Sequence, residues 1–156
     1  MATKEELTNG INVLITEAKR IGARLSDDQW AAAGNEGGWT NRQILAHVAG
    51  VGSMVIPFVT SIANAAPGAD GGAGLDINAL NAQIVGQRAD KTVPQLIDEL
   101  AANYSAVIEW LRTAPDDLLD RRASFAVYQD LTLSDLAMQV VVMHGIAHLY
   151  YAASGL

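Results

Sequence analysis

The chain has 156 residues, half of them hydrophobic and 17% charged, which gives room for one folded domain over residues 1–156. Its formal net charge of −7 argues against nucleic-acid binding, which needs basic residues to replace counterions. The sequence has no cysteine, and this excludes disulfides, zinc–thiolate sites, iron–sulfur clusters and a cysteine nucleophile.

Four segments carry the same signature of a helix N-terminus. In each, a threonine is followed three residues later by an acidic or amide residue, so that the hydroxyl and the second side chain can cap each other's backbone amides. The four threonines are Thr3, Thr40, Thr92 and Thr132. The last box is imperfect, because Asp135 is shorter than the preferred Glu or Gln.

Each capping signature precedes apolar residues spaced at alternating steps of three and four, which predicts an amphipathic helix. No alternating run bounded by turn residues competes, so we expect no sheet and an all-α four-helix bundle. The four stripes are Leu7, Ile11, Leu14, Ala18, Ile21 and Leu25; Ile44, His47, Val51, Met54 and Phe58; Leu96, Leu100, Tyr104, Val107 and Leu111; and Leu133, Ala137, Val140, His144, Ala147 and Tyr151.

The connections between these helices are long. Residues 30–38 and 64–74 are rich in glycine and alanine and are expected to be loops, the second of them the most flexible. Asp76 is expected to cap an additional short helix that runs through Arg88. Residues 114–131 form a further connector with a new turn at Pro115. Long connectors permit crossovers, so the bundle need not be simply up-and-down.

A membrane protein with two spans is an alternative. Residues 43–69 and 136–156 carry no charged side chain and are long enough to cross a bilayer. Both stretches contain polar residues, and neither has the Lys/Arg-rich flanks that set orientation. The first residues are acidic where a signal peptide would be apolar. We therefore expect a cytoplasmic protein with no membrane partner.

All three histidines lie on or beside these apolar stripes. His144 and His148 are four residues apart, a spacing that lets two imidazoles bind one metal ion, and His47 is the remaining histidine for a third ligand. Three buried imidazoles without partners would cost about 1–3 kcal/mol each, which a shared ion would offset. The alternative is that each is a core histidine hydrogen-bonded to a carbonyl or hydroxyl.

Three segments resemble motifs of the DinB-like (DinB/YfiT) superfamily of metalloenzymes. They are Gly38–Gly50, which contains Trp39, Thr40 and His47; Asp76–Gln83 followed by Arg88-Ala89-Asp90; and the closing His144-Gly145-Ile146-Ala147-His148. The resemblance implies a four-helix bundle in which His47, His144 and His148 hold a divalent metal, zinc or nickel, and in which homodimers are common. Many relatives carry an acid or amide within or just after the closing histidines, and this chain does not.

The resemblance also implies a class of chemistry. The superfamily includes thiol-dependent enzymes, among them mycothiol-dependent maleylpyruvate isomerase and bacillithiol transferases. Three neutral nitrogen ligands leave an open metal position and a strong Lewis acid. We expect a transferase, isomerase or hydrolase in which a low-molecular-weight thiol or water attacks a small electrophilic substrate. No general base is evident, so the catalytic residues are unknown. The alternative is a non-catalytic, stress-related metal-binding bundle.

Four further residues are candidates for substrate binding. Asn81 and Arg88 are seven residues apart and so share a face of the additional helix, where they could bind an anion. Tyr104 and Tyr151 lie on or near inward faces and could orient a ligand, although core packing with an exposed hydroxyl is the favoured explanation. The second and fourth helices are apolar nearly all round, which predicts a homodimer.

Overall fold

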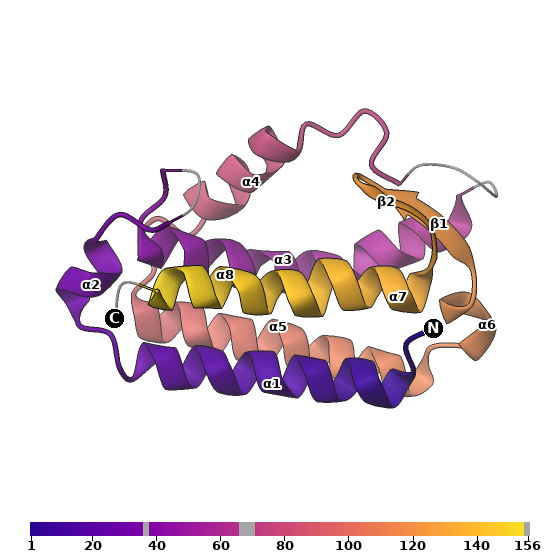
Figure 1. Ribbon diagram of the computed structural model, residues 1–156, viewed down its shortest axis with the longest axis horizontal. Helices are drawn as coiled ribbons and strands as arrows, with labels where there is room; N and C mark the ends of the chain where they lie inside the picture. The colour runs from indigo at the N-terminus through magenta and orange to yellow at the C-terminus, as the bar shows by residue number, and fades with distance from the viewer. Residues whose placement is uncertain (36–37, 66–70, 155–156) are drawn as a thin grey trace.

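Four long helices run side by side in the computed structural model, which describes residues 1–35, 38–65 and 71–154 (Figure 1). They are α1 (Lys4–Gly22), α3 (Asn41–Asn64), α5 (Val93–Thr113) and a composite helix made of α7 (Leu133–Ala137), a π-helix η1 (Met138–Met143) and α8 (His144–Ala153). The smaller elements are α2 (Asp27–Ala31), α4 (Ile77–Gly86), α6 (Asp116–Leu119), β1 (Arg122–Phe125) and β2 (Tyr128–Thr132). The expected four-helix bundle is confirmed.

The order of the helices explains the long connectors. α1 and α8 point the same way, and α3 and α5 both point the opposite way (Figure 1). The chain must therefore return along the length of the bundle between α3 and α5, and it does so through the segment that contains α4. This is the crossover that the long connector permitted. Residues 66–70 of the connector expected to be flexible lie outside the described part of the chain.

The helix N-termini form as the capping signatures predict. Thr3, Thr40 and Thr92 each make a complete capping box, in which the hydroxyl accepts from the third backbone amide and the side chain there accepts from the cap amide. Thr132 accepts from the amide of Asp135, but the Asp135 carboxylate accepts from the backbone of Ala2 instead. The imperfect fourth box thus links the composite helix to the N-terminal segment.

Two short elements were not expected. Ser26 and Gln29 form a fourth complete capping box, which starts α2, and the last two residues of this helix were expected to belong to a loop. A β-hairpin of β1 and β2 also corrects the expectation of no sheet, with Ala123 paired to Leu131 and a bulge before Phe125. Its strands are too short to show alternation, and its turn has Ala126 at φ 54° rather than the glycine or asparagine that marks such turns.

The π-helix changes which face of the last helix is buried. Sequence periodicity places Val140, His144, Ala147 and Tyr151 inward, yet Ala147 and Tyr151 are exposed. One extra residue in the π segment rotates the following residues by about 100°. The buried positions within and beyond it are therefore Val141, Val142, Gly145, His148, Leu149 and Ala152. The prediction was wrong by one residue, because uniform α-helical spacing was assumed.

Glycines allow the helices to approach closely at two points in the core. A Cβ on Gly52 of α3 would lie 2.7 Å from Cε2 of Tyr104 on α5, and a Cβ on Gly145 of α8 would lie 3.0 Å from Cδ1 of Leu14 on α1. Both partners are completely buried. These contacts fix α3 against α5 and α8 against α1, and so position the two helices that carry the histidines.

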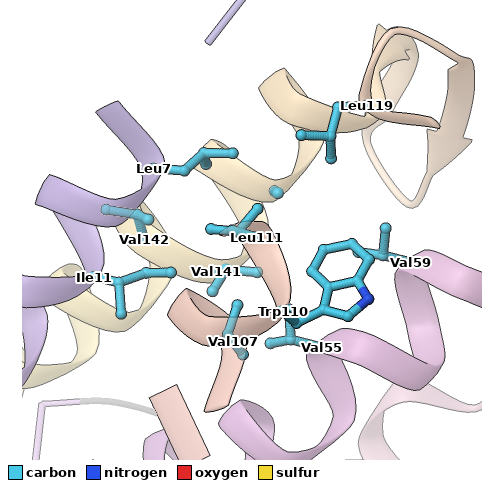
Figure 2. Close-up of a pocket in the computed structure, with 11 residues that line it drawn as sticks. Leu7, Ile11, Val55, Val59, Val107, Trp110, Leu111, Leu119, Val141 and Val142 are labelled. Atoms are coloured by element: carbon cyan, nitrogen blue, oxygen red, sulfur yellow. The ribbon is translucent and has the colours of Figure 1, made fainter. Parts of the chain in front are cut away.

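A small cavity lies in the core near the end of the bundle where α1 begins and α5 ends. It encloses about 10 Å³ and is lined by apolar side chains, among them Leu7 of α1, Val59 of α3 and Leu111 of α5 (Figure 2). An apolar space of this size is at the lower limit for one water molecule and offers no polar partner for it. It is a packing defect of the core rather than a ligand site.

Two helices are long and apolar enough to cross a membrane by those criteria alone. They are Asn41–Asn64 and Leu133–Ala153, whose most apolar windows are 56% and 39% buried inside the protein. A core helix of a bundle passes the same test, and α3 has neighbours on several sides in this fold.

Candidate metal centre

The three histidines meet at one end of the bundle. His47 lies in the second turn of α3, and His144 and His148 lie one turn apart in α8. One ring nitrogen from each can be chosen so that all three lie within 4.8 Å of one another. The ring centroids are 5.4 Å apart for His47 and His144, 4.8 Å for His47 and His148, and 4.1 Å for His144 and His148.

The two histidines of α8 point their Nε2 atoms at each other. These atoms are 2.7 Å apart, and the ring planes are nearly perpendicular at 87°. A contact of this length between two ring nitrogens shares a single proton, so the two rings cannot both donate. Both Nε2 atoms face the same point between the two rings, where an ion would replace that proton.

The spacing of the three donors fits a metal ion. A tetrahedral zinc ion with Zn–N distances of about 2.0–2.1 Å holds its ligand atoms about 3.4 Å apart. The His144–His148 contact is shorter than that value at 2.7 Å, and the three donors lie within 4.8 Å of one another, so an ion would draw them into place through small side-chain rotations. Nδ1 of His47 is also buried with no hydrogen-bond partner among the described residues, so hydrogen bonding to the protein does not account for the burial of this nitrogen. The donor set of three imidazoles suits zinc or nickel.

Burial keeps two of the rings neutral. The His47 side chain is 2% exposed, and its burial, followed by the nearby charges of His148 and His144, lowers its pKa to about 3. His144 is half-buried, and burial together with the charge of His148 lowers its pKa to about 4. A neutral imidazole is the form that binds metal. These rings are therefore ready to act as ligands at neutral pH without first releasing a proton.

The sequence around Thr40 explains how His47 is held. The Thr40–Gln43 capping box fixes the first turn of α3, so that His47 faces α8 one turn later. A hydrogen bond also joins the two ends of the loop before α3, in which the Gly34 amide donates to the Trp39 carbonyl at 2.7 Å. The Trp39 ring then lies against the His47 ring, with centroids 5.3 Å apart.

The substrate-binding candidates are placed differently from one another. Tyr151 lies beside the site, 6.4 Å from His148 between ring centroids, and is 46% exposed. Tyr104 is completely buried, its hydroxyl donates to the Val48 carbonyl at 3.4 Å, and burial raises its pKa. Contact between Tyr104 and a substrate would require α3 and α5 to separate.

Arg88 and Asn81 lie on the α4 side of α3. Arg88 is buried and donates to Glu99 at 2.8 Å and to the Ile84 carbonyl at 2.8 Å. Although burial would raise the pKa of Glu99, hydrogen bonds from Lys91 and Arg88 hold it below its usual range. Asn81 is half-buried on α4. Anion binding by Asn81 and Arg88 stays a prediction, and the arginine already has an anionic partner.

Trp39 is a site residue that sequence reasoning missed. Its position before the Thr40 cap predicts only a hydrophobic staple against Ile44. The structure places its ring against a candidate metal ligand instead. The signal that could have found it is its spacing from His47: a side chain just before the cap lies at the same end of the helix as a residue in the second turn.

Comparisons with known proteins agree with this arrangement. The sequence model of the DinB superfamily matches residues 18–152. Among solved structures, YfiT from Bacillus subtilis is similar with a TM-score of 0.67 at 20% sequence identity, covering 97% of this chain and 84% of that one. YfiT is described as a probable metal-dependent hydrolase with an unusual four-helix bundle topology. At this identity the likeness shows the fold. No curated protein matches the chain.

Proposed function

The chain belongs to the DinB superfamily, as its histidine motifs indicated, and on this basis we propose that it is an enzyme that depends on a divalent metal ion. The observation that carries the proposal is the meeting of three imidazoles from two helices far apart in the chain, within 4.8 Å of one another. The description of YfiT as a probable metal-dependent hydrolase supports the same class of activity.

His47, His144 and His148 would hold the ion, which is zinc or nickel. Such an ion, held by three neutral nitrogens, is a Lewis acid that lowers the pKa of a water or thiol bound to it. The protein's own contribution is to hold the rings of His47 and His144 neutral and to shield one side of the site. His47 and His148 are buried, whereas His144 is half-buried, so a small substrate approaches from the side of His144.

The reaction is attack by a low-molecular-weight thiol or by water on a small electrophile, which makes the protein a transferase, an isomerase or a hydrolase. The chain has no cysteine, so any thiol is a cosubstrate. The histidine group in the described part of the chain contains no carboxylate to serve as a general base. Because the ion would lower the pKa of the bound water or thiol, this nucleophile would lose its proton near neutral pH without a general base.

A turnover assay tests this proposal. Untagged protein loaded with zinc or nickel is given 1-chloro-2,4-dinitrobenzene with each of several small thiols, and separately a p-nitrophenyl ester without thiol. The expected result is turnover in at least one assay that is lost on chelation and restored by metal. Gln139→Ala, an exposed change on the same composite helix, is the matched control and keeps the activity. Rates equal to those of a variant with all three histidines replaced by alanine would refute the proposal.

The proposal includes a homodimer of a cytoplasmic protein. Adjacent helices expose three large apolar side chains, Val13 of α1 at 51%, Met143 of η1 at 53% and Tyr150 of α8 at 61%. A second copy that covers them removes this surface from water. Sedimentation should give a dimer mass that Met143→Glu reduces to a monomer mass, and a monomeric unmodified protein would contradict it. Recovery only in detergent would contradict the cytoplasmic location.

A further inference from the structure

Two aromatic rings flank the three-histidine group. The Trp39 ring lies 5.3 Å from the ring of His47, and the Tyr151 ring lies 6.4 Å from the ring of His148. Trp39 is half-buried and Tyr151 is 46% exposed, so both keep part of their surface open to a ligand. Tyr151 owes this position to the π-helix, which turns it out of the core stripe that sequence periodicity predicts.

Hydrogen bonds tie the two flanking elements together. The Asn35 amide donates to Ser154 Oγ at 2.5 Å, and Ser154 Oγ donates to the Tyr151 carbonyl at 2.8 Å. Asn35 belongs to the loop in which Gly34 bonds to the Trp39 carbonyl. The loop that carries Trp39 and the helix end that carries Tyr151 are therefore linked on the side of the site where the two rings lie beside His47 and His148.

We propose that Trp39 and Tyr151 form an aromatic subsite that binds the flat, apolar part of an anionic ligand whose donor atom occupies the open metal position. This rests on the proposed function, because it needs a metal at the three histidines. Three neutral ligands leave the full double positive charge of the ion, which selects an anionic donor such as a thiolate or hydroxamate. The two flanking rings select what is attached to that donor.

Aromatic contacts favour a planar ligand by a modest and measurable factor. A well-placed aromatic pair contributes about a 2- to 10-fold gain in affinity beyond simple burial. The substrate class is therefore an aromatic or conjugated anion, in preference to an aliphatic anion with the same donor group.

Calorimetric titration of the zinc-loaded protein tests the subsite, with benzohydroxamate and acetohydroxamate as probes. The ratio of their affinities should favour benzohydroxamate, and Trp39→Leu and Tyr151→Leu should each reduce this ratio about 2- to 10-fold at unchanged zinc content. The matched controls are Trp110→Leu on α5 and Tyr128→Leu on β2, both at the opposite end of the bundle, and they should leave the ratio unchanged (Figure 1).

The possible failures separate the two proposals. Zinc binding with an affinity ratio that neither Trp39→Leu nor Tyr151→Leu changes would overturn the aromatic subsite and leave the metal site intact. An equal reduction by the two control variants would also overturn it, because the effect would then be general destabilisation. Failure of the unmodified protein to bind zinc or nickel would overturn the proposed function itself.

Discussion

Replacement of His47 by leucine should stabilise the metal-free protein while it removes a metal ligand. His47 is 2% exposed, and its Nδ1 has no hydrogen-bond partner among the described residues. A buried polar atom without a partner costs about 1–3 kcal/mol of folding free energy. Leucine carries no such atom, so His47→Leu should raise the free energy of unfolding at pH 7 by about that amount. A binding residue that is unfavourable for stability is typical of functional sites.

The gain should increase as the pH falls. Burial lowers the pKa of His47 to about 3 in the folded protein, so the unfolded chain takes up a proton first, near the ordinary histidine pKa of 6.5. Stability that depends on the neutral ring is present above that value and is lost as the pH falls towards the folded-state pKa. Between pH 7 and pH 5 the unmodified protein should lose about 2 kcal/mol through His47 that the leucine variant retains.

Urea denaturation in the presence of a chelator, at pH 7 and at pH 5, measures both effects. Ile44→Val is the matched control, because it changes a completely buried residue one turn earlier on α3. It should destabilise by about 0.5–1.5 kcal/mol at both pH values. The reasoning is refuted if His47→Leu destabilises the metal-free protein at pH 7, or if its difference from the unmodified protein is the same at pH 5.

Three other substitutions test how the bundle holds the site. Gly52→Ala should lower the free energy of unfolding by about 1–3 kcal/mol in urea titration, because its Cβ would overlap the Tyr104 ring; no loss would show that α3 and α5 separate easily. Arg88→Met should lower the free energy of unfolding by about 2–3 kcal/mol, because it removes a largely buried partner of Glu99. An unchanged free energy of unfolding would show that the pair is dispensable. Thr40→Ala should lower the free energy of unfolding by about 1 kcal/mol and weaken metal binding, because it removes the cap of the turn that precedes His47. Unchanged metal affinity would contradict a role of Thr40 in positioning His47.

Local signals in the sequence were sufficient for the four long helices. The threonine hydroxyls at Thr3, Thr40 and Thr92 form the capping boxes that their spacing predicts, because a cap depends only on residues within one turn. The hairpin was missed because its two strands are short, and its turn at Ala126 lacks a characteristic residue. The π-helix was missed because its extra residue leaves no mark in an apolar run, and this shifted the predicted buried face by one position.

The candidate site was predictable in its histidines and not in its surroundings. The i, i+4 spacing of His144 and His148 survives the shift in the buried face, because both residues follow the π-helix and keep their relation to each other. The position of Trp39 against His47 depends on the path of a loop, which periodicity does not describe. The pairing of Arg88 with Glu99 depends on how α4 packs across the bundle, a long-range contact that composition and spacing leave open.

Elemental mass spectrometry of untagged protein measures whether His47, His144 and His148 share one metal ion. We expect about one zinc or nickel ion per chain, and none in a protein with all three histidines replaced by alanine. Equal and negligible metal in the two proteins, after growth with both metals supplied, would contradict it.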